Sequence, residues 1–259
     1  MSSAPTPSVG LVSFVGAGPG DPELLTVKGR KAIVEAGLVL YAGSLVPPEI
    51  VACASAGARI ADSAVLTLEQ CHSLVCEAAL AGQAVARVHT GDPSLFGALL
   101  EQTELLDRDG IPWRVIPGVT AACAAAAAGG VSFSVPEITQ SLIICRMAGR
   151  TPVREAERPG ALAAHGASLA VYLSGHTAGE LQEELLTALP GDTPVLCAHQ
   201  VGWPQEELVW TTIVGMADVV AERYLEQQTV FLVLPGQGKK ARPSRLYDKT
   251  FSHSFRDGA

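Results

Sequence analysis

Several features are scarce or absent in this chain of 259 residues, and each absence narrows the choice of function. Basic residues are few: 18 Lys and Arg stand against 26 Asp and Glu, for a net charge of −8. An acidic protein repels phosphate backbones, so nucleic acid is not expected as a partner. No apolar run approaches the ~20 residues that cross a bilayer, and the start MSSAPTPSVG lacks a basic and apolar leader. We therefore expect a cytoplasmic protein without membrane association.

Cysteine motifs are also missing. None of the six cysteines forms a C-x-x-C pair, and no histidine stands at zinc-ligand spacing from them. Most of them lie in apolar stretches, which is typical of buried free thiols in a reducing compartment. We therefore expect no metal site. The six are Cys53, Cys71, Cys76, Cys123, Cys145 and Cys197.

Apolar residues, in contrast, are plentiful: they make up 48% of the chain, enough to build a sizeable core. In the first half, the pattern predicts strands at 10–15, 38–41, 84–89 and 113–116. Between them it predicts helices at 22–36, 71–81 and 96–108. Alternating strands and helices indicate an α/β fold with a mainly parallel sheet.

The pattern changes at Pro117-Gly118, where we place the boundary between an N-terminal α/β domain, 1–117, and a C-terminal α/β domain, 118–259. An alanine-rich helix is expected at 121–128 and a second helix at 178–189. Strands are expected at 141–145, 169–173, 195–199, 207–212 and 229–234. Some of these strands follow one another without a helix, so we expect a mixed sheet. A basic tail covers 236–259.

A glycine-rich turn, Gly16-x-Gly18-x-Gly20, follows the first strand. Its spacing differs from the G-x-G-x-x-G of dinucleotide-binding folds, because the third glycine comes one residue early. The acidic residue that would hold a ribose after the second strand is also missing, since that strand ends in Tyr41-Ala-Gly-Ser44. The turn therefore does not predict NAD or FAD binding.

The turn instead resembles a motif of another family. The segment 15–29, VGAGPGDPELLTVKG, is similar to the N-terminal signature of the tetrapyrrole (corrin/porphyrin) methylases. Four further segments resemble motifs of that family in the same order: RVHTGDPS at 87–94, PGVTA at 117–121, VYLSG at 171–175 and TPVLCA at 193–198. The resemblance spans residues 11 to about 235. Segments 41–46, 244–248 and 251–256 resemble one branch of the family, whose members methylate a ring carbon in the vitamin B12 pathway.

The resemblance implies two α/β domains with the active site in the cleft between them, and a homodimer. It also implies binding of S-adenosylmethionine, with S-adenosylhomocysteine as the product. Carried over residue by residue, it implies a cofactor site in both halves of the chain. That site comprises Pro19, Thr90, Gly91, Asp92, Leu95, Thr120, Ala121, Leu173, Ala198 and Val230.

Methyl transfer makes few demands on side chains, because the sulfonium is already an activated leaving group and alignment supplies most of the acceleration. We expect no protein nucleophile and no catalytic metal. The sequence does not identify a general base, although Tyr172 and His89 are candidates. Asp92 has a second interpretation, because Asp followed by Pro93 also suits the start of a helix.

Tetrapyrrole substrates carry many carboxylates, so we expect arginines to bind them. Arg146, Arg150 and Arg154 recur every four residues and are our candidates, with Arg158 next in the series. They would share a face of a continuous helix, but Gly149 and Pro152 argue for a loop. A second basic group lies in the tail, with His253 beside it: Lys239, Lys240, Arg242, Arg245 and Arg256.

Other functions stay open on the sequence alone. The substrate could contain cobalt or be metal-free, or another ring carbon could be methylated. A relative that methylates ribosomal RNA or a protein is a more distant possibility. A protein that binds a corrin intermediate without turnover belongs to a different class.

Overall fold

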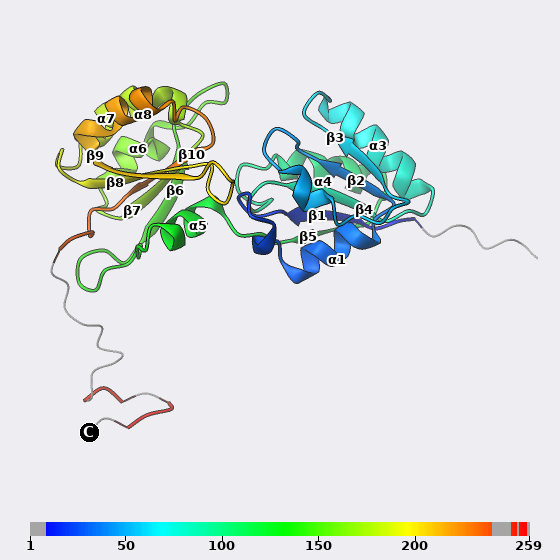
Figure 1. Cartoon of the computed structure of the whole chain (residues 1–259), viewed down its shortest axis with the longest axis horizontal. Helices are drawn as coiled ribbons and strands as arrows, with labels where there is room; N and C mark the ends of the chain where they lie inside the picture. Colours follow the sequence, from blue (N-terminus) through cyan, green and yellow to red (C-terminus); the bar gives the residue numbers. More distant parts are fainter. Residues whose placement is uncertain (1–8, 240–249, 253, 258–259) are drawn as a thin grey trace, which may run out of the picture. The chain divides into compact units, whose positions relative to one another are not determined.

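The computed structural model describes residues 9–239, 250–252 and 254–257 (Figure 1). Much of the predicted basic tail, including Lys240, Arg242, Arg245 and His253, therefore lies outside the described residues, as does segment 244–248. Within the described ranges, no helix is both long enough and apolar enough to cross a bilayer.

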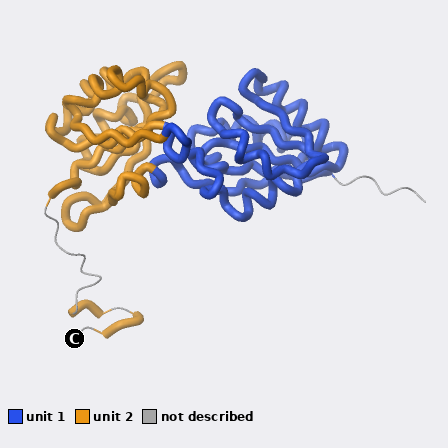
Figure 2. The backbone as a smooth tube through the Cα atoms, viewed as in Figure 1, with its two compact units in different colours: residues 1–124, 200–205 blue, residues 125–199, 206–259 orange. Residues whose placement is uncertain are grey.

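The chain forms two compact units (Figure 2). Unit 1 comprises residues 1–124 and 200–205, and unit 2 comprises 125–199 and 206–259. The sequence places its boundary at 117, whereas the contacts group 118–124 with unit 1. Gly118 and the buried Ala122 belong to the packing of unit 1, and the segment 200–205 returns to it.

Unit 1 is built on a parallel sheet of five strands in the order β3-β2-β4-β1-β5. The strands predicted at 10–15, 38–41, 84–89 and 113–116 correspond to β1, β2, β4 and β5. The exposed edge strand β3 was not predicted. In chain order the strands are β1 (Val12–Gly16), β2 (Leu38–Tyr41), β3 (Arg59–Asp62), β4 (Val85–His89) and β5 (Trp113–Ile116).

Helices cover both faces of this sheet. Apolar residues of α1 and α2 pack with Val15, Val39 and Val88 on one face. Residues of α3 and α4 pack with Phe14 and Leu40 on the other. The helices of unit 1 are η1 (Pro22–Leu24), α1 (Val27–Glu35), α2 (Pro48–Val51), α3 (Leu68–Leu80) and α4 (Leu99–Arg108). The helix α5 (Ala121–Ala128) spans the division between the units.

Unit 2 contains the expected mixed sheet, in the order β6-β7-β10-β8-β9. β6 and β7 are parallel, and the other neighbours are antiparallel. The strands are β6 (Leu142–Arg146), β7 (Ser168–Tyr172), β8 (Pro194–His199), β9 (Glu207–Thr212) and β10 (Thr229–Val233). The helical elements are η2 (Glu155–Glu157), α6 (Pro159–Ala163), η3 (Gly175–Thr177), α7 (Ala178–Leu186), η4 (Ile213–Gly215) and α8 (Met216–Arg223).

The helices α6, α7 and α8 cover one face of this sheet, where their apolar residues meet Phe231, Cys197 and Leu169 (Figure 1). The residue that follows α5, Gly129, packs against Leu196 on the opposite face. A Cβ added to Gly129 would lie only 2.5 Å from Cδ2 of Leu196. Only glycine allows the chain to approach the strand so closely there.

Two local expectations need correction. The helix predicted at 22–36 is two elements, because Asp21 caps η1 and Thr26 then caps α1 through the Gly29 amide, 3.0 Å away. The helix predicted from 96 begins at Leu99, since Phe96 and Ala98 have positive φ. The cysteines also differ from expectation: Cys123 is exposed, and Cys53 and Cys76 are only partly buried.

Candidate functional site

Three loops of unit 1 meet at the carboxyl ends of β4, β1 and β5, which are neighbours in the sheet. A Cβ added to Gly118 would lie 2.1 Å from the carbonyl oxygen of Gly91 and 2.7 Å from Cα of Gly16. A Cβ on Gly16 would lie 2.4 Å from the amide nitrogen of Gly118. The backbones touch directly, so glycine is required at both positions.

Hydrogen bonds join the first two loops. The Gly91 amide donates to the Gly18 carbonyl at 2.7 Å, and the Gly18 amide donates back at 3.2 Å. Gly18 and Gly91 both have positive φ, +79° and +60°, which side chains rarely tolerate. The glycine-rich turn of the sequence is thus tied to the segment that follows β4.

Asp92 joins the second loop to the third. Its Oδ2 accepts from the Gly118 amide at 3.0 Å, while its Oδ1 accepts from the amide of Ser94 at 2.9 Å and from the Ser94 hydroxyl. Burial acts to raise the pKa of this carboxyl, but the bonds from Ser94 and Gly118 outweigh it and leave the pKa below its usual value. Asp92 therefore holds the loops as an ionised carboxylate, and it does not cap α4, which begins seven residues later.

Trp203, which the sequence analysis missed, covers the glycine-rich turn. Its indole Nε1 donates to the carbonyl of Pro19 at 3.0 Å. A Cβ on Gly20 would lie 2.3 Å from the Trp203 ring, so the ring rests directly on the glycine backbone. Trp203 belongs to segment 200–205, between β8 and β9, where no motif marks it.

The predicted cofactor residues of unit 1 lie on loops that follow parallel strands, except Ala121, which begins α5 directly after the third loop. Pro19 follows β1 and is buried, whereas the residues after β4 and β5 are mostly half-buried. Since these strands are parallel neighbours, their loops all lie at the carboxyl end of the sheet. The residues at this carboxyl end are Pro19, Thr90, Gly91, Asp92, Leu95, Thr120 and Ala121.

The structure also brings together the three predicted residues of unit 2. Val230 of β10 pairs with Ala198 of β8, and both are buried. β10 runs antiparallel to β7 with Phe231 opposite Val171, so its first residues lie beside the end of β7, where Leu173 follows. All three therefore lie at one end of the second sheet.

Leu173 has an unusual backbone and an unusual exposure. Its φ is +53°, and its side chain is 70% exposed although it is apolar. The next residue, Ser174, is fully buried; its hydroxyl accepts from the Met147 amide at 2.9 Å and donates to the Tyr172 carbonyl at 2.6 Å. Strain at an exposed apolar residue, held by a buried anchor, is typical of functional positions.

The two candidate bases differ in position. His89 ends β4 and is 6% exposed, and burial together with nearby Arg87 lowers its pKa to about 3. Its Nε2 has no hydrogen-bond partner among the described residues. A group with so low a pKa is a weak base at neutral pH, so His89 is a poor candidate. Tyr172 ends β7 and is half-buried.

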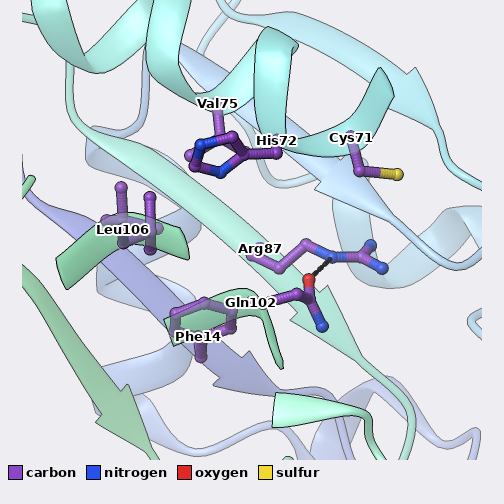
Figure 3. Close-up of a pocket in the computed structure, with 8 residues that line it drawn as sticks. Phe14, Cys71, His72, Val75, Arg87, Gln102 and Leu106 are labelled. Atoms are coloured by element: carbon purple, nitrogen blue, oxygen red, sulfur yellow. Dashed lines mark hydrogen bonds between the residues drawn. The ribbon is translucent and has the colours of Figure 1, made fainter. Parts of the chain in front are cut away.

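Arg87, from the same motif, has a structural environment. Its guanidinium lies among residues of α3 and α4 and donates to Gln102 Oε1 at 3.0 Å (Figure 3). It also donates to Ser63 Oγ at 3.0 Å. Burial lowers its pKa. Figure 3 shows this side chain in a pocket with Phe14 and Leu106. The pocket lies on a face of the sheet, not at the carboxyl end where the loops lie.

The candidate substrate-binding arginines lie on an extended segment, not on one helix. Arg146 ends β6, and its guanidinium donates to the Thr151 carbonyl at 3.2 Å. Arg150 is exposed. Arg154 is ion-paired with Glu157, and Arg158 is ion-paired with Glu184 and, at 3.3 Å, with Glu155. The four side chains therefore do not form a single helical face.

Each unit, taken by itself, offers side chains suited to part of an S-adenosylmethionine molecule. The loops at the carboxyl end of the first sheet offer half-buried polar residues suited to a ribose and an amino-acid group: Thr90, Asp92 and Thr120. The exposed Leu173 of unit 2 offers apolar surface suited to an adenine ring.

Comparison with known proteins gives consistent matches. Residues 11–217 match the family model of Tetrapyrrole (Corrin/Porphyrin) Methylases. A precorrin-4 C(11)-methyltransferase of Pseudomonas aeruginosa is 42% identical over 250 residues, 95% of this chain and 99% of its own. The solved structure of a cobalt precorrin-4 methyltransferase is 38% identical with a TM-score of 0.84, covering 86% of this chain and 94% of its own. A uroporphyrin-III C-methyl transferase of Thermus thermophilus, solved with S-adenosyl homocysteine, is 25% identical with a TM-score of 0.70, covering 86% and 92%.

Proposed function

The chain belongs to the tetrapyrrole methylases, and from this premise we propose that it transfers a methyl group from S-adenosylmethionine to C-11 of precorrin-4 in cobalamin biosynthesis, giving precorrin-5. The observation that carries the proposal is the match to a precorrin-4 C(11)-methyltransferase over nearly the whole of both chains. The loops joined at Gly16, Gly91 and Gly118 support it, because they carry three of the family's motifs.

The chain's own residues bind and orient. S-adenosylmethionine supplies a methyl group on a positively charged sulfur, which departs with the electron pair of the broken carbon–sulfur bond as the ring carbon attacks. We propose that the loops containing Thr90, Asp92 and Thr120 bind the cofactor and that Leu173 packs on its adenine. Asp92 acts by fixing the loop backbones through Gly118 and Ser94. Holding the reacting atoms in line then provides most of the rate enhancement.

The metal content of the substrate is part of the test, because similar proteins carry both names, precorrin-4 and cobalt precorrin-4. Purified full-length protein is incubated with methyl-labelled S-adenosylmethionine and with each of the two substrates. We expect one labelled methyl at C-11 of at least one product, located by NMR. A methyl at another ring carbon would make the proposed position wrong, and cofactor or ring binding without transfer would indicate a binding protein.

We propose that Arg146, Arg150 and Arg154 bind substrate carboxylates, and Arg150 gives the sharpest test because it is exposed. Arg150→Glu should raise KM for the tetrapyrrole about tenfold or more, since a charge-assisted bond is replaced by repulsion. Affinity for S-adenosylmethionine, measured by calorimetry, should stay unchanged. Arg30→Glu reverses an exposed charge on α1 and is the matched control. An unchanged KM in Arg150→Glu, Arg146→Ala and Arg154→Ala together would contradict the proposal.

We also propose that the enzyme works as a homodimer, as its family resemblance implies, and in the cytoplasm, because free thiols are typical of a reducing compartment. Light scattering on purified protein should give twice the mass of the 259-residue chain. The mass of a single chain would contradict the dimer without touching the proposed reaction.

A further inference from the structure

Three side chains that can bind a metal converge on unit 1, on α3 and just after α4. His72 and Cys76 stand four residues apart on α3, and Asp109 follows the end of α4. His72 Nε2 lies 2.7 Å from Asp109 Oδ2 and 3.2 Å from Cys76 Sγ, and Sγ lies 3.8 Å from the same Oδ2. The sequence analysis missed this group, because it looked for C-x-x-C pairs and for histidines at zinc-ligand spacing, and not for an i, i+4 His–Cys pair completed by a residue 33 positions away.

The distances are close to those of a zinc site. In a tetrahedral site with bonds of about 2.0–2.3 Å, neighbouring ligand atoms lie about 3.3–3.6 Å apart. The observed separations of 2.7, 3.2 and 3.8 Å differ from this range by about 0.1 to 0.6 Å. Small side-chain rotations would therefore open the group around an ion.

Hydrogen bonding satisfies the Cys76 thiol only through a long contact, because Sγ donates to Asp109 Oδ2 at 3.8 Å. Nε2 is close to both a carboxylate and a thiol, but a neutral ring nitrogen either donates or accepts. If it donates to Asp109, it cannot accept from Cys76. A cation in the centre would bind a lone pair of each atom at once.

The neighbouring Arg108 orients the Asp109 carboxylate. Arg108 Nε donates to Oδ1 of Asp109 at 2.8 Å and its Nη2 donates to Oδ2 at 3.1 Å, which orients the carboxylate and leaves lone pairs for other partners. The side chains of His72 and Asp109 are 12% and 34% exposed, so a water could complete the coordination.

We propose that His72 Nε2, Cys76 Sγ and Asp109 Oδ2 bind a Zn²⁺ ion that clamps α3 to the end of α4. The combination of thiolate, imidazole and carboxylate is one that zinc accepts. Asp109 precedes β5, so the site lies toward the amino ends of the strands, whereas the methylase motifs lie at their carboxyl ends. His72 also lines the pocket in Figure 3, together with Val75 and Leu106. The ion has a structural role separate from methyl transfer.

The test uses full-length protein without an affinity tag, stripped with a chelator and then titrated with Zn²⁺ against a chromophoric competitor. We expect one high-affinity Zn²⁺ per chain, and affinity reduced about 100-fold or more in His72→Ala and in Cys76→Ser. Cys53→Ser, a partly buried thiol donating to the Ile50 carbonyl, is the matched control and should bind as the wild type does.

Two further measurements test the thiolate ligand and check that the variant protein is folded. With Co²⁺ as the probe, the wild type should show a thiolate-to-metal charge-transfer band that Cys76→Ser lacks. Asp109→Asn, a nearly isosteric change at a partly exposed side chain, should also weaken Zn²⁺ binding while keeping affinity for S-adenosylmethionine, which reports an intact fold. Wild-type protein that binds no more zinc than His72→Ala, or that binds Co²⁺ without the thiolate band, would overturn the proposal.

Discussion

At the scale of single residues, contacts between backbones constrain the proposed cofactor site more tightly than any side chain does. Gly16 ends one strand, Gly91 and Gly118 follow two others, and there is no room for a methyl group on Gly16 or on Gly118. The sequence shows that glycines are present but not that they touch, because their positions are 27 to 102 residues apart. Asp92 was predicted to bind cofactor, and the structure adds its hydrogen bond to Gly118.

Gly118→Ala should lower the free energy of unfolding by about 2–3 kcal/mol, because its Cβ would overlap the Gly91 carbonyl and the backbone must shift. Methyl transfer should fall with it. Urea unfolding and a labelled-methyl assay measure the two effects. Gly179→Ala on α7, where a Cβ meets nothing within 4 Å, should instead be neutral or stabilising by up to about 1 kcal/mol. Equal behaviour of the two variants would contradict the close contact.

His89 should make stability depend on pH. Its pKa is about 3 in the folded protein and about 6.5 in the unfolded chain, so only the unfolded chain takes up a proton between these values. Its contribution is complete above pH 6.5 and is lost as the pH falls. From pH 7 to pH 5, the wild type should lose about 2 kcal/mol more than His89→Leu.

Unfolding curves at both pH values measure this difference. The exposed His165, changed to Leu, is the control and should follow the wild type. Parallel losses in wild type and His89→Leu would show that His89 is not held neutral by burial.

At the scale of elements, the sequence predicts regular structure best where the residue types match the element. The bounds of β2, β5, α5 and β9 agree with the predicted ranges: β2 is an apolar run, α5 is alanine-rich, and β5 and β9 are rich in β-branched and aromatic residues. β3 was missed because Arg59–Asp62 is largely exposed at the sheet edge and lacks that pattern. α2 and α6 were missed because each has only four or five residues and begins at a proline.

The end of β7 carries a prediction of its own, because Leu173 adopts a left-handed conformation that costs a branched side chain about 1 kcal/mol. Leu173→Gly should leave stability unchanged or raise it by up to about 1 kcal/mol. It should weaken S-adenosylmethionine binding about tenfold or more, through loss of apolar contact. Calorimetry and thermal unfolding measure the two quantities.

Tyr224 provides the control for this variant, since it has φ of +58° and is 82% exposed at the end of α8. Tyr224→Gly should change stability in the same direction and leave cofactor affinity unaltered. If Leu173→Gly binds cofactor normally, the strained backbone does not serve adenine packing.

At the scale of the whole molecule, composition and motif order predicted an α/β protein with a parallel and a mixed sheet, and the structure confirms this. The return of residues 200–205 to unit 1 was not predicted. A six-residue segment has no periodicity that would reveal its partners, and Trp203 has no motif around it. The long-range contact with Pro19 joins positions 184 residues apart.

Trp203→Ala should lower the free energy of unfolding by about 2 kcal/mol, because a half-buried ring leaves the glycine-rich turn, and it should weaken cofactor binding. Trp203→Phe keeps most of the ring but removes the bond to Pro19, and should cost about 1 kcal/mol. Trp210 on β9 is 44% exposed, and Trp210→Ala is the matched control for cofactor affinity. Normal cofactor binding in Trp203→Ala would show that the covering indole does not shape the site.

The path of residues 200–205 limits how this enzyme can be recombined with its relatives. The chain passes from one unit to the other three times, at 124/125, 199/200 and 205/206. A chimera made at a single junction after α5 would therefore combine the glycine-rich turn of one parent with the covering tryptophan segment of the other. An exchange that keeps the turn and the tryptophan segment from one parent must transfer 200–205 together with the first 124 residues. The exchangeable structural unit is therefore encoded by two separate stretches of the gene.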